Sequence, residues 1–228
     1  QQLRSLLSTS VVNPIFDTAL PNMVQALQRQ LAHVLRWVEG SADVDVSAMR
    51  DALLDALDAF FSKPPEDIRV VILTGAGGHY CSGLDLAEHV ARDAESTMYH
   101  SRNWHRVMER IQFSGLPVVS AMFGAVIGGG LELASATHVR IAEPSTIFQL
   151  PEGMRGIFVG GGASVRVGRI LGADRMTEMM LTGRKYNAQE GVSLGLAHYA
   201  VGDGEAFAKA MELAEVIASN APLSNYMM

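Results

Sequence analysis

Residues 121–152 decide the fold of this chain, and they read AMFGAVIGGGLELASATHVRIAEPSTIFQLPE. An uncharged run over residues 117–123 predicts a buried strand, which leads to three consecutive glycines, Gly128 to Gly130. The glycines open a short apolar helix that carries Glu132, and a second carboxylate, Glu152, ends the stretch. A buried strand that delivers the chain into a glycine turn and a helix is typical of an α/β fold.

The same unit occurs earlier in the chain. Residues 68–73 form a β-branched run that predicts a strand covered on both faces, followed by a glycine-rich turn and a helix beginning near Leu84. A dinucleotide fingerprint would require glycine where Tyr80 stands, and a phosphate loop would require a Gly-Lys-Ser/Thr sequence that is absent. The two glycine turns therefore do not indicate nucleotide binding.

Hydrophobic periodicity places helices and strands over the remainder. We expect an N-terminal helix over 22–38 and a second helix over 47–60 that begins with Ser47 as its N-cap. Further helices are predicted over 97–113, 174–181, 187–194 and from Glu205, another begins after the glycines 160–162, and further strands are predicted over 138–142 and 198–201.

Composition excludes several classes of protein. The 228 residues are 48% hydrophobic and 18% charged, which fits a globular domain with a sizeable core. A net charge of -6 with only three lysines argues against binding to nucleic acid. The uncharged segment 111–131 contains Pro117 and a cluster of glycines, so we expect no membrane span, and no signal peptide is visible. The single cysteine, Cys81, fits a reducing compartment, so we expect a cytoplasmic protein.

Two interpretations fit the glycine clusters. The first amides of a helix lack internal acceptors, so the turns at Gly83–Leu84 and Gly128–Gly130 could offer two N–H groups to one carbonyl oxygen. Alternatively, the glycines only permit close packing of the backbone. Glu132 and Glu152 both stand in apolar sequence, where two carboxylates can have separated pKa values and divide the roles of acid and base, but sequence alone does not show that they face each other.

Several motifs, taken in order, carry a resemblance to a known family. They are Thr74-Gly75, Cys81-Ser82-Gly83-Leu84-Asp85-Leu86, Gly128-Gly129-Gly130-Leu131-Glu132-Leu133, Phe148 to Glu152, and Gly156 with Gly160 to Gly162. Together they resemble the crotonase superfamily, most closely its enoyl-CoA hydratases, over about residues 47–201. The resemblance implies a spiral of ββα units with a helical C-terminal region.

The resemblance also implies roles for individual residues. The amides of Leu84 and Gly129 match the family's oxyanion hole for a thioester carbonyl. Glu132 matches the glutamate that helps activate water for attack at the β-carbon, and Glu152 matches the one that supplies a proton to the α-carbon. Gly160 matches a glycine whose amide positions the water. Because related isomerases and hydrolases commonly replace one or both glutamates, their presence here favours a hydratase.

The coenzyme A adenine pocket of the family is matched by Ser82, Leu84 and Leu86. The resemblance implies an acyl-CoA thioester as partner, coenzyme A as part of the substrate with no prosthetic group, and a homotrimer or hexamer acting in fatty acid metabolism. Sequence spacing predicts no metal site. We divide the chain into a divergent N-terminal helical segment (1–46), a crotonase-like core (47–203) and the start of the C-terminal helical region (204–228).

Three alternatives remain open on the sequence. The chain could be an enoyl-CoA isomerase, a thioester hydrolase, or a paralogue that binds acyl-CoA without turnover. The altered N-terminal part would permit the last of these. The family's first strand and its Asn-Arg-Pro stretch are not recognisable before Ser47, and Ala87 stands where many hydratases have a lysine near the coenzyme phosphates.

Overall fold

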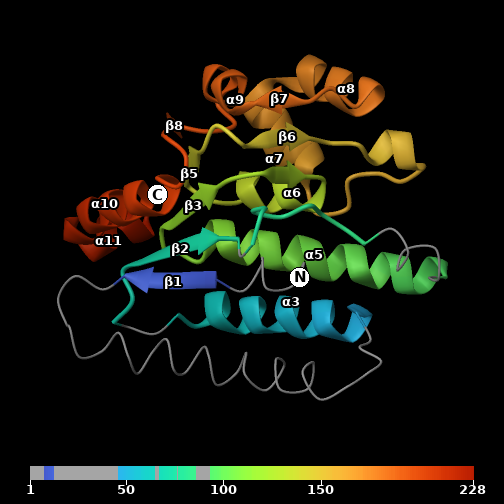
Figure 1. Cartoon of the computed structure of the whole chain (residues 1–228). Coiled ribbons are helices and arrows are strands. Elements are labelled where there is room, and N and C mark those ends of the chain that lie inside the picture. The colour runs from blue at the N-terminus through green and yellow to red at the C-terminus, as the bar shows by residue number, and fades with distance from the viewer. Residues whose placement is uncertain (1–7, 13–45, 65–66, 76, 86–92) are drawn as a thin grey trace.

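The computed structural model describes residues 8–12, 46–64, 67–75, 77–85 and 93–228. Its main sheet has five strands in the order β1-β2-β3-β5-β8 (Figure 1). Their bounds are Ser8–Val12, Val70–Thr74, Val118–Met122, Val139–Ala142 and Tyr199–Ala200. The strands β2, β3, β5 and β8 are parallel neighbours, whereas β1 pairs antiparallel with β2 along the edge.

A second, smaller sheet lies beside the first. It consists of β4 (Ala125–Ile127), β6 (Ile147–Gln149) and β7 (Tyr186–Asn187) in the order β4-β6-β7. Cys81 forms an isolated parallel bridge with Val126, which ties the turn after β2 to this sheet. The short pairing of β4 with β6 is parallel, so both strands carry the chain in the same direction toward the glycine turn and toward Glu152.

Helices cover both faces of the main sheet. The helices α3 (Val46–Ser62) and α5 (Ala94–Phe113) run side by side (Figure 1), and α5 packs on one face of the sheet. The helix α10 (Ala206–Ser219) packs on the other face against β2, β3 and β5, with α11 (Pro222–Tyr226) next to it. The smaller sheet is accompanied by α6, the 3-10 helix η1, α7, α8 and α9. Their bounds are Gly129–Ser135, Glu152–Arg155, Ala163–Leu171, Ala173–Thr182 and Ala188–Leu194.

The two faces of the sheet bury alternate residues of each strand. In β2, Val71 and Leu73 belong to the large core with α5, whereas Val70 and Ile72 face the small core with α10. Successive side chains of a strand point to opposite faces, so a strand covered twice is apolar throughout. The helix α10 contacts the sheet through four buried alanines spaced by four, which lets its backbone pack close to the strands. These are Ala206, Ala210, Ala214 and Ala218.

Most elements predicted from periodicity are present within two or three residues of their expected bounds, and the fold class is confirmed. The expected N-cap Ser47 is wrong, because α3 begins at Val46 and includes it. Leu84 and Asp85 are irregular, and the residues just after them lie outside the described part of the chain, so the helix expected to begin near Leu84 stays a prediction. The helix expected over 22–38 also lies outside the described residues. The strand β1 lies within the N-terminal segment that was predicted to be helical, so that prediction is wrong for these five residues. The sequence pattern did not reveal this first strand. No helix in the described part of the chain is both long and apolar enough to cross a bilayer.

Candidate active site

The two glycine turns meet backbone to backbone. Cys81 accepts a hydrogen bond from the amide of Ile127 at 3.1 Å, which places the turn after it beside the turn at Gly128. Gly83 has a φ of +87°, and a β-carbon there would lie 2.7 Å from the Ile127 carbonyl oxygen and 3.2 Å from the Gly129 nitrogen. Only a residue without a side chain allows this approach, so the close packing of the two turns depends on glycine at position 83.

The amides of Leu84 and Gly129 lie on these two turns. Neither donates a hydrogen bond to another residue in the described part of the chain. Gly129 is the first residue of α6, where a helix leaves its amides without internal acceptors. The turns that carry the two predicted oxyanion-hole amides are therefore brought together by the fold.

Glu132 is held by three N–H donors. Its side chain is 3% exposed, in the first turn of α6. Oε1 accepts the amides of Gly161 at 2.7 Å and Ala163 at 3.1 Å, and Oε2 accepts the indole Nε1–H of Trp104 at 3.0 Å. All three partners are N–H groups that only donate, so the Glu132 oxygens are the acceptors in all three hydrogen bonds.

Glu152 lies in a different environment. It is 6% exposed at the start of η1, and its Oε2 atom has no hydrogen-bond partner among the described residues. Burial raises the pKa of this carboxyl to about 7; the hydrogen bond with its own amide opposes the rise, and the negative charge of Glu132 adds to it. A carboxyl with this pKa can both hold and release a proton near neutral pH.

The pairing of the small sheet brings Glu152 to the glycine turn. Gly128 donates its amide to the carbonyl of Gln149 at 2.9 Å, so the end of β6 is fastened to the start of α6. A β-carbon at position 128 would lie 2.9 Å from Glu152 Oε1. The φ of Gly128 is +55° as well, so both space and backbone conformation favour glycine there.

The loop before α7 supports Glu132 from the other side. Arg166 is buried and donates from Nη1 to the carbonyl of Gly161 at 3.0 Å and from Nε to Gln112 Oε1 at 2.6 Å. Ser101 donates to the carbonyl of Gly160 at 2.8 Å. Side chains therefore bind the loop at two successive carbonyls, those of Gly160 and Gly161.

The structure brings together five of the predicted site residues and leaves others aside. Glu132, Glu152 and the turns of Leu84 and Gly129 surround one region, with Gly160 at its edge. Ser82 is exposed next to the Gly83 turn, and Leu86 lies outside the described residues.

Sequence reasoning missed three contacts, those of Trp104, Gly161 and Ala163 with Glu132. The amides could have been anticipated, because a glycine cluster that opens a helix offers several unpaired N–H groups and not only one. Trp104 gave no such signal, since its helical spacing with Val107 and Ile111 is that of an ordinary packing residue.

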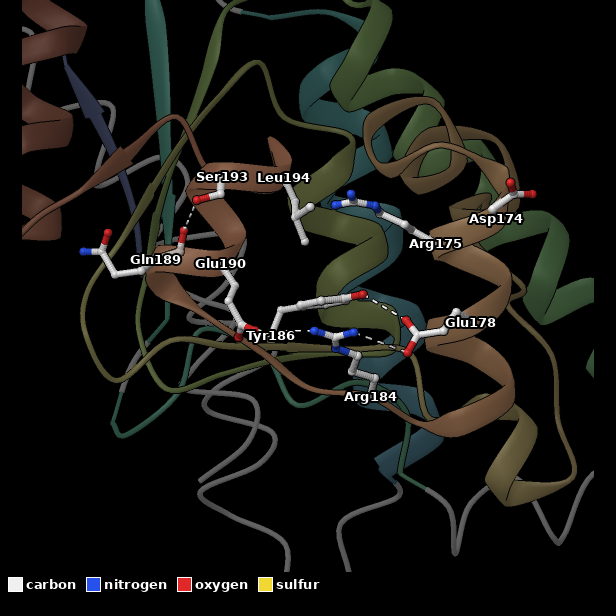
Figure 2. Close-up of a pocket in the computed structure, with 9 residues that line it drawn as sticks. All are labelled: Asp174, Arg175, Glu178, Arg184, Tyr186, Gln189, Glu190, Ser193 and Leu194. Atoms are coloured by element: carbon white, nitrogen blue, oxygen red, sulfur yellow. Dashed lines mark hydrogen bonds and ion pairs between the residues drawn. The ribbon is translucent and has the colours of Figure 1, made fainter.

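A cavity of about 670 Å³ lies elsewhere, between α8, β7 and α9. Figure 2 shows Arg184 between Glu178 and Glu190, at 3.6 and 3.7 Å, with the Tyr186 hydroxyl donating to Glu178. The Arg184 guanidinium also lies 4.7 Å from the centre of the Tyr186 ring. Arg184 thus pairs with both glutamates of the cavity, whereas Glu152 Oε2 has no hydrogen-bond partner among the described residues. No group of three or more His, Cys, Asp or Glu able to hold a metal occurs in the described ranges.

Known proteins resemble this chain in sequence and in structure. The family model described as enoyl-CoA hydratase/isomerase matches residues 44–228. An enoyl-CoA hydratase of Mycobacterium tuberculosis, EchA19, is 34% identical over 77% of this chain and 66% of its own length. The carnitinyl-CoA dehydratase of Proteus mirabilis is 35% identical over 69% of this chain and 60% of its own. The chain thus spans about two thirds of the length of these relatives.

Solved structures agree with the sequence relatives. A Rhodopseudomonas palustris protein with a provisional enoyl-CoA hydratase name superposes with a TM-score of 0.73 at 51% identity, over 77% of this chain and 68% of that one. An enoyl-CoA hydratase of Bacillus anthracis gives a TM-score of 0.73 at 36% identity, over 77% and 69%. The fold is that of the crotonase superfamily. Within it, this chain belongs to the enoyl-CoA hydratase/isomerase family.

Proposed function

We propose that this chain is an enoyl-CoA hydratase, which adds water across the α,β double bond of an acyl-CoA thioester. One observation carries the proposal: two buried carboxylates stand beside paired glycine turns in unequal environments, one held by three donors and the other with an oxygen that has no partner among the described residues. Addition of water needs one group to orient and deprotonate the nucleophile and another to deliver a proton, and an unequal pair supplies both.

The thioester carbonyl would be bound by the amides of Leu84 and Gly129. Attack of water at the β-carbon moves negative charge onto the carbonyl oxygen, and two preformed donors stabilise that charge without reorganising. The loss of one such donor costs about 3–4 kcal/mol of transition-state stabilisation in other enzymes. The glycines at 83 and 130 matter because a β-carbon at either position would meet the backbone of the other turn, so glycine lets the two turns approach closely.

Glu132 would orient the water. A carboxylate offers about four lone-pair positions, and three are taken here by N–H donors, two on Oε1 and one on Oε2. The remaining position on Oε2 can accept one hydrogen bond from water, whose oxygen then points toward the substrate. As hydroxide adds to the β-carbon, the proton of the water passes to Glu132.

Glu152 would supply the second proton. Its pKa of about 7 keeps a substantial protonated fraction at neutral pH, and that proton is transferred to the α-carbon as the enolate collapses. The product has gained one proton and one hydroxide, the elements of water. Return of the proton from Glu132 to Glu152 restores the starting state of the pair.

The test is hydration of crotonyl-CoA, followed by the loss of absorbance of the conjugated thioester, for wild type and for Glu132→Gln and Glu152→Gln. We expect each substitution to lower kcat by about a hundredfold or more, with the fold intact by circular dichroism. Glu215→Gln, at an exposed position of α10, is the matched control and should retain the wild-type rate. Turnover close to wild type in either site variant would remove the assignment.

An isomerase is the second candidate, because a carboxyl with a pKa near 7 also suits proton transfer between the α- and γ-carbons of a 3-enoyl thioester. Product analysis separates the two reactions. A 3-enoyl-CoA converted to the conjugated isomer faster than crotonyl-CoA is hydrated would favour isomerisation over hydration.

A further inference from the structure

Trp104 contacts the two central parts of the site at once. It lies in the middle of α5, is half-buried, and donates its indole N–H to Glu132. The same ring lies against the glycine turn, because a β-carbon at Gly129 would approach its Cζ2 atom to 3.1 Å. On its third side the ring is against Gly161, where a β-carbon would overlap the indole.

The indole therefore stands between the three groups that the reaction uses. Gly129 supplies a proposed oxyanion-hole amide, Glu132 the proposed water-orienting carboxylate, and Gly161 an amide that fixes this carboxylate. Of these contacts only the N–H bond to Glu132 requires tryptophan. A phenylalanine ring would fill much of the same space, but it would leave Oε2 without its donor.

The helix that carries Trp104 is rigidly placed. One turn earlier on the same face, Ser101 donates to the carbonyl of Gly160, so α5 holds both the loop and the carboxylate that the loop binds. One to two turns later, Val107, Met108 and Ile111 are fully buried in the large core. The indole is thus a rigid group on an anchored helix, and its N–H fixes the position of the Glu132 carboxylate to which it donates.

We propose that Trp104 is a positioning residue of the site: its indole N–H fixes the Glu132 carboxylate in the one rotamer that leaves a single Oε2 lone pair for water. The proposal rests on the proposed function, because positioning matters only if Glu132 acts on a water. Without the indole donor, Oε2 would have two open positions and the side chain would lose one of its three restraints. Water would then occupy more than one orientation relative to the substrate.

The kinetic test compares Trp104→Phe with wild type. Misplacement of a reacting group by about 1 Å can cost about a hundredfold in rate, so we expect kcat for crotonyl-CoA to fall by about ten- to a hundredfold while KM stays within about twofold. Tyr99→Phe, at a 60% exposed position of the same helix, is the control and should keep the wild-type kcat. A Trp104→Phe enzyme with kcat within twofold of wild type overturns the proposal.

A second measurement tests the contact without any turnover. The chain has two tryptophans, so the indole region of a ¹⁵N–¹H spectrum of the labelled protein carries two Nε1–H signals, and Trp104→Phe assigns them. We expect the Trp104 signal to move clearly in Glu132→Gln and to stay near its place in Glu152→Gln. If it does not move in Glu132→Gln, the positioning role is refuted even in an active hydratase. If wild type hydrates no enoyl thioester while the signal moves as expected, the proposed function fails and the role in catalysis fails with it.

Discussion

Replacing Glu152 by glutamine should change how the stability of the protein depends on pH. In the folded state the pKa of this carboxyl rises from about 4.5 to about 7, chiefly because it is buried. The difference corresponds to about 3 kcal/mol of free energy that folding must supply to keep the ionised group in the interior. Glutamine carries no charge at any pH, so this contribution disappears in the variant.

The sign follows from proton binding. Below about pH 4.5 the carboxyl is protonated in both states, so it contributes no pH dependence. Between about pH 4.5 and 7 the folded state binds more protons than the unfolded state, and the free energy of unfolding falls as pH rises. Above about pH 7 the carboxyl is ionised in both states, so its effect on the free energy of unfolding no longer changes with pH. Relative to its own value at pH 4.5, Glu152→Gln should therefore gain up to about 3 kcal/mol over wild type by pH 8.

Urea unfolding followed by circular dichroism at a series of pH values measures this difference. Glu215→Gln, in an exposed part of α10, serves as the control and should follow the wild-type curve at every pH. The burial of an amide in place of a carboxyl adds an offset that does not vary with pH, so the slope alone carries the result. A wild-type minus variant difference that is constant within about 0.5 kcal/mol from pH 4.5 to 8 would refute the electrostatic description of Glu152.

Two further predictions concern stability. Gly130→Ala places a β-carbon against the carbonyl oxygen of Cys81, so we expect the free energy of unfolding in urea to fall by about 1–3 kcal/mol or more. The control Gly78→Ala has open space around it and should stay within about 0.5 kcal/mol of wild type. Equal effects of the two substitutions would contradict the close contact of the two turns. Asn187 and Glu190 cap the start of α9 reciprocally at 2.9 Å, so Asn187→Ala should cost about 1 kcal/mol in thermal unfolding, and an unchanged melting temperature would contradict the cap.

The repeated strand, glycine turn and helix could be predicted from sequence because parallel strands buried on both faces are continuous apolar runs. The strands at 70–74 and 118–122 have this signal, and the glycines after each mark the turns. The edge strand β1 begins Ser8-Thr9-Ser10 and shows no such run, so it escaped prediction. The strands β4, β6 and β7 have two or three residues each, too few for any period to show.

The meeting of Glu132 and Glu152 could not be predicted from residue patterns alone, because it depends on those short strands. The pairing of β4 with β6 and the bond from Gly128 to Gln149 bring positions twenty residues apart to one place. The hydrogen bond from Trp104 to Glu132 could not be predicted for a related reason. Helical spacing identifies the face that a helix buries, but it does not reveal that an indole N–H on that face meets a carboxylate from another helix.

The different roles of the two glutamates arise from their surroundings and not from the residues themselves. Two carboxylates close enough to interact raise the cost of ionising both, and hydrogen-bond donors and burial act on each one separately. Glu132 has three N–H donors, and its charge adds to the burial that raises the pKa of Glu152 to about 7. Removing the indole donor takes away one of the three hydrogen bonds that fix the Glu132 carboxylate and leaves Glu152 in its buried place, so Trp104→Phe should lower kcat by misplacing Glu132 alone.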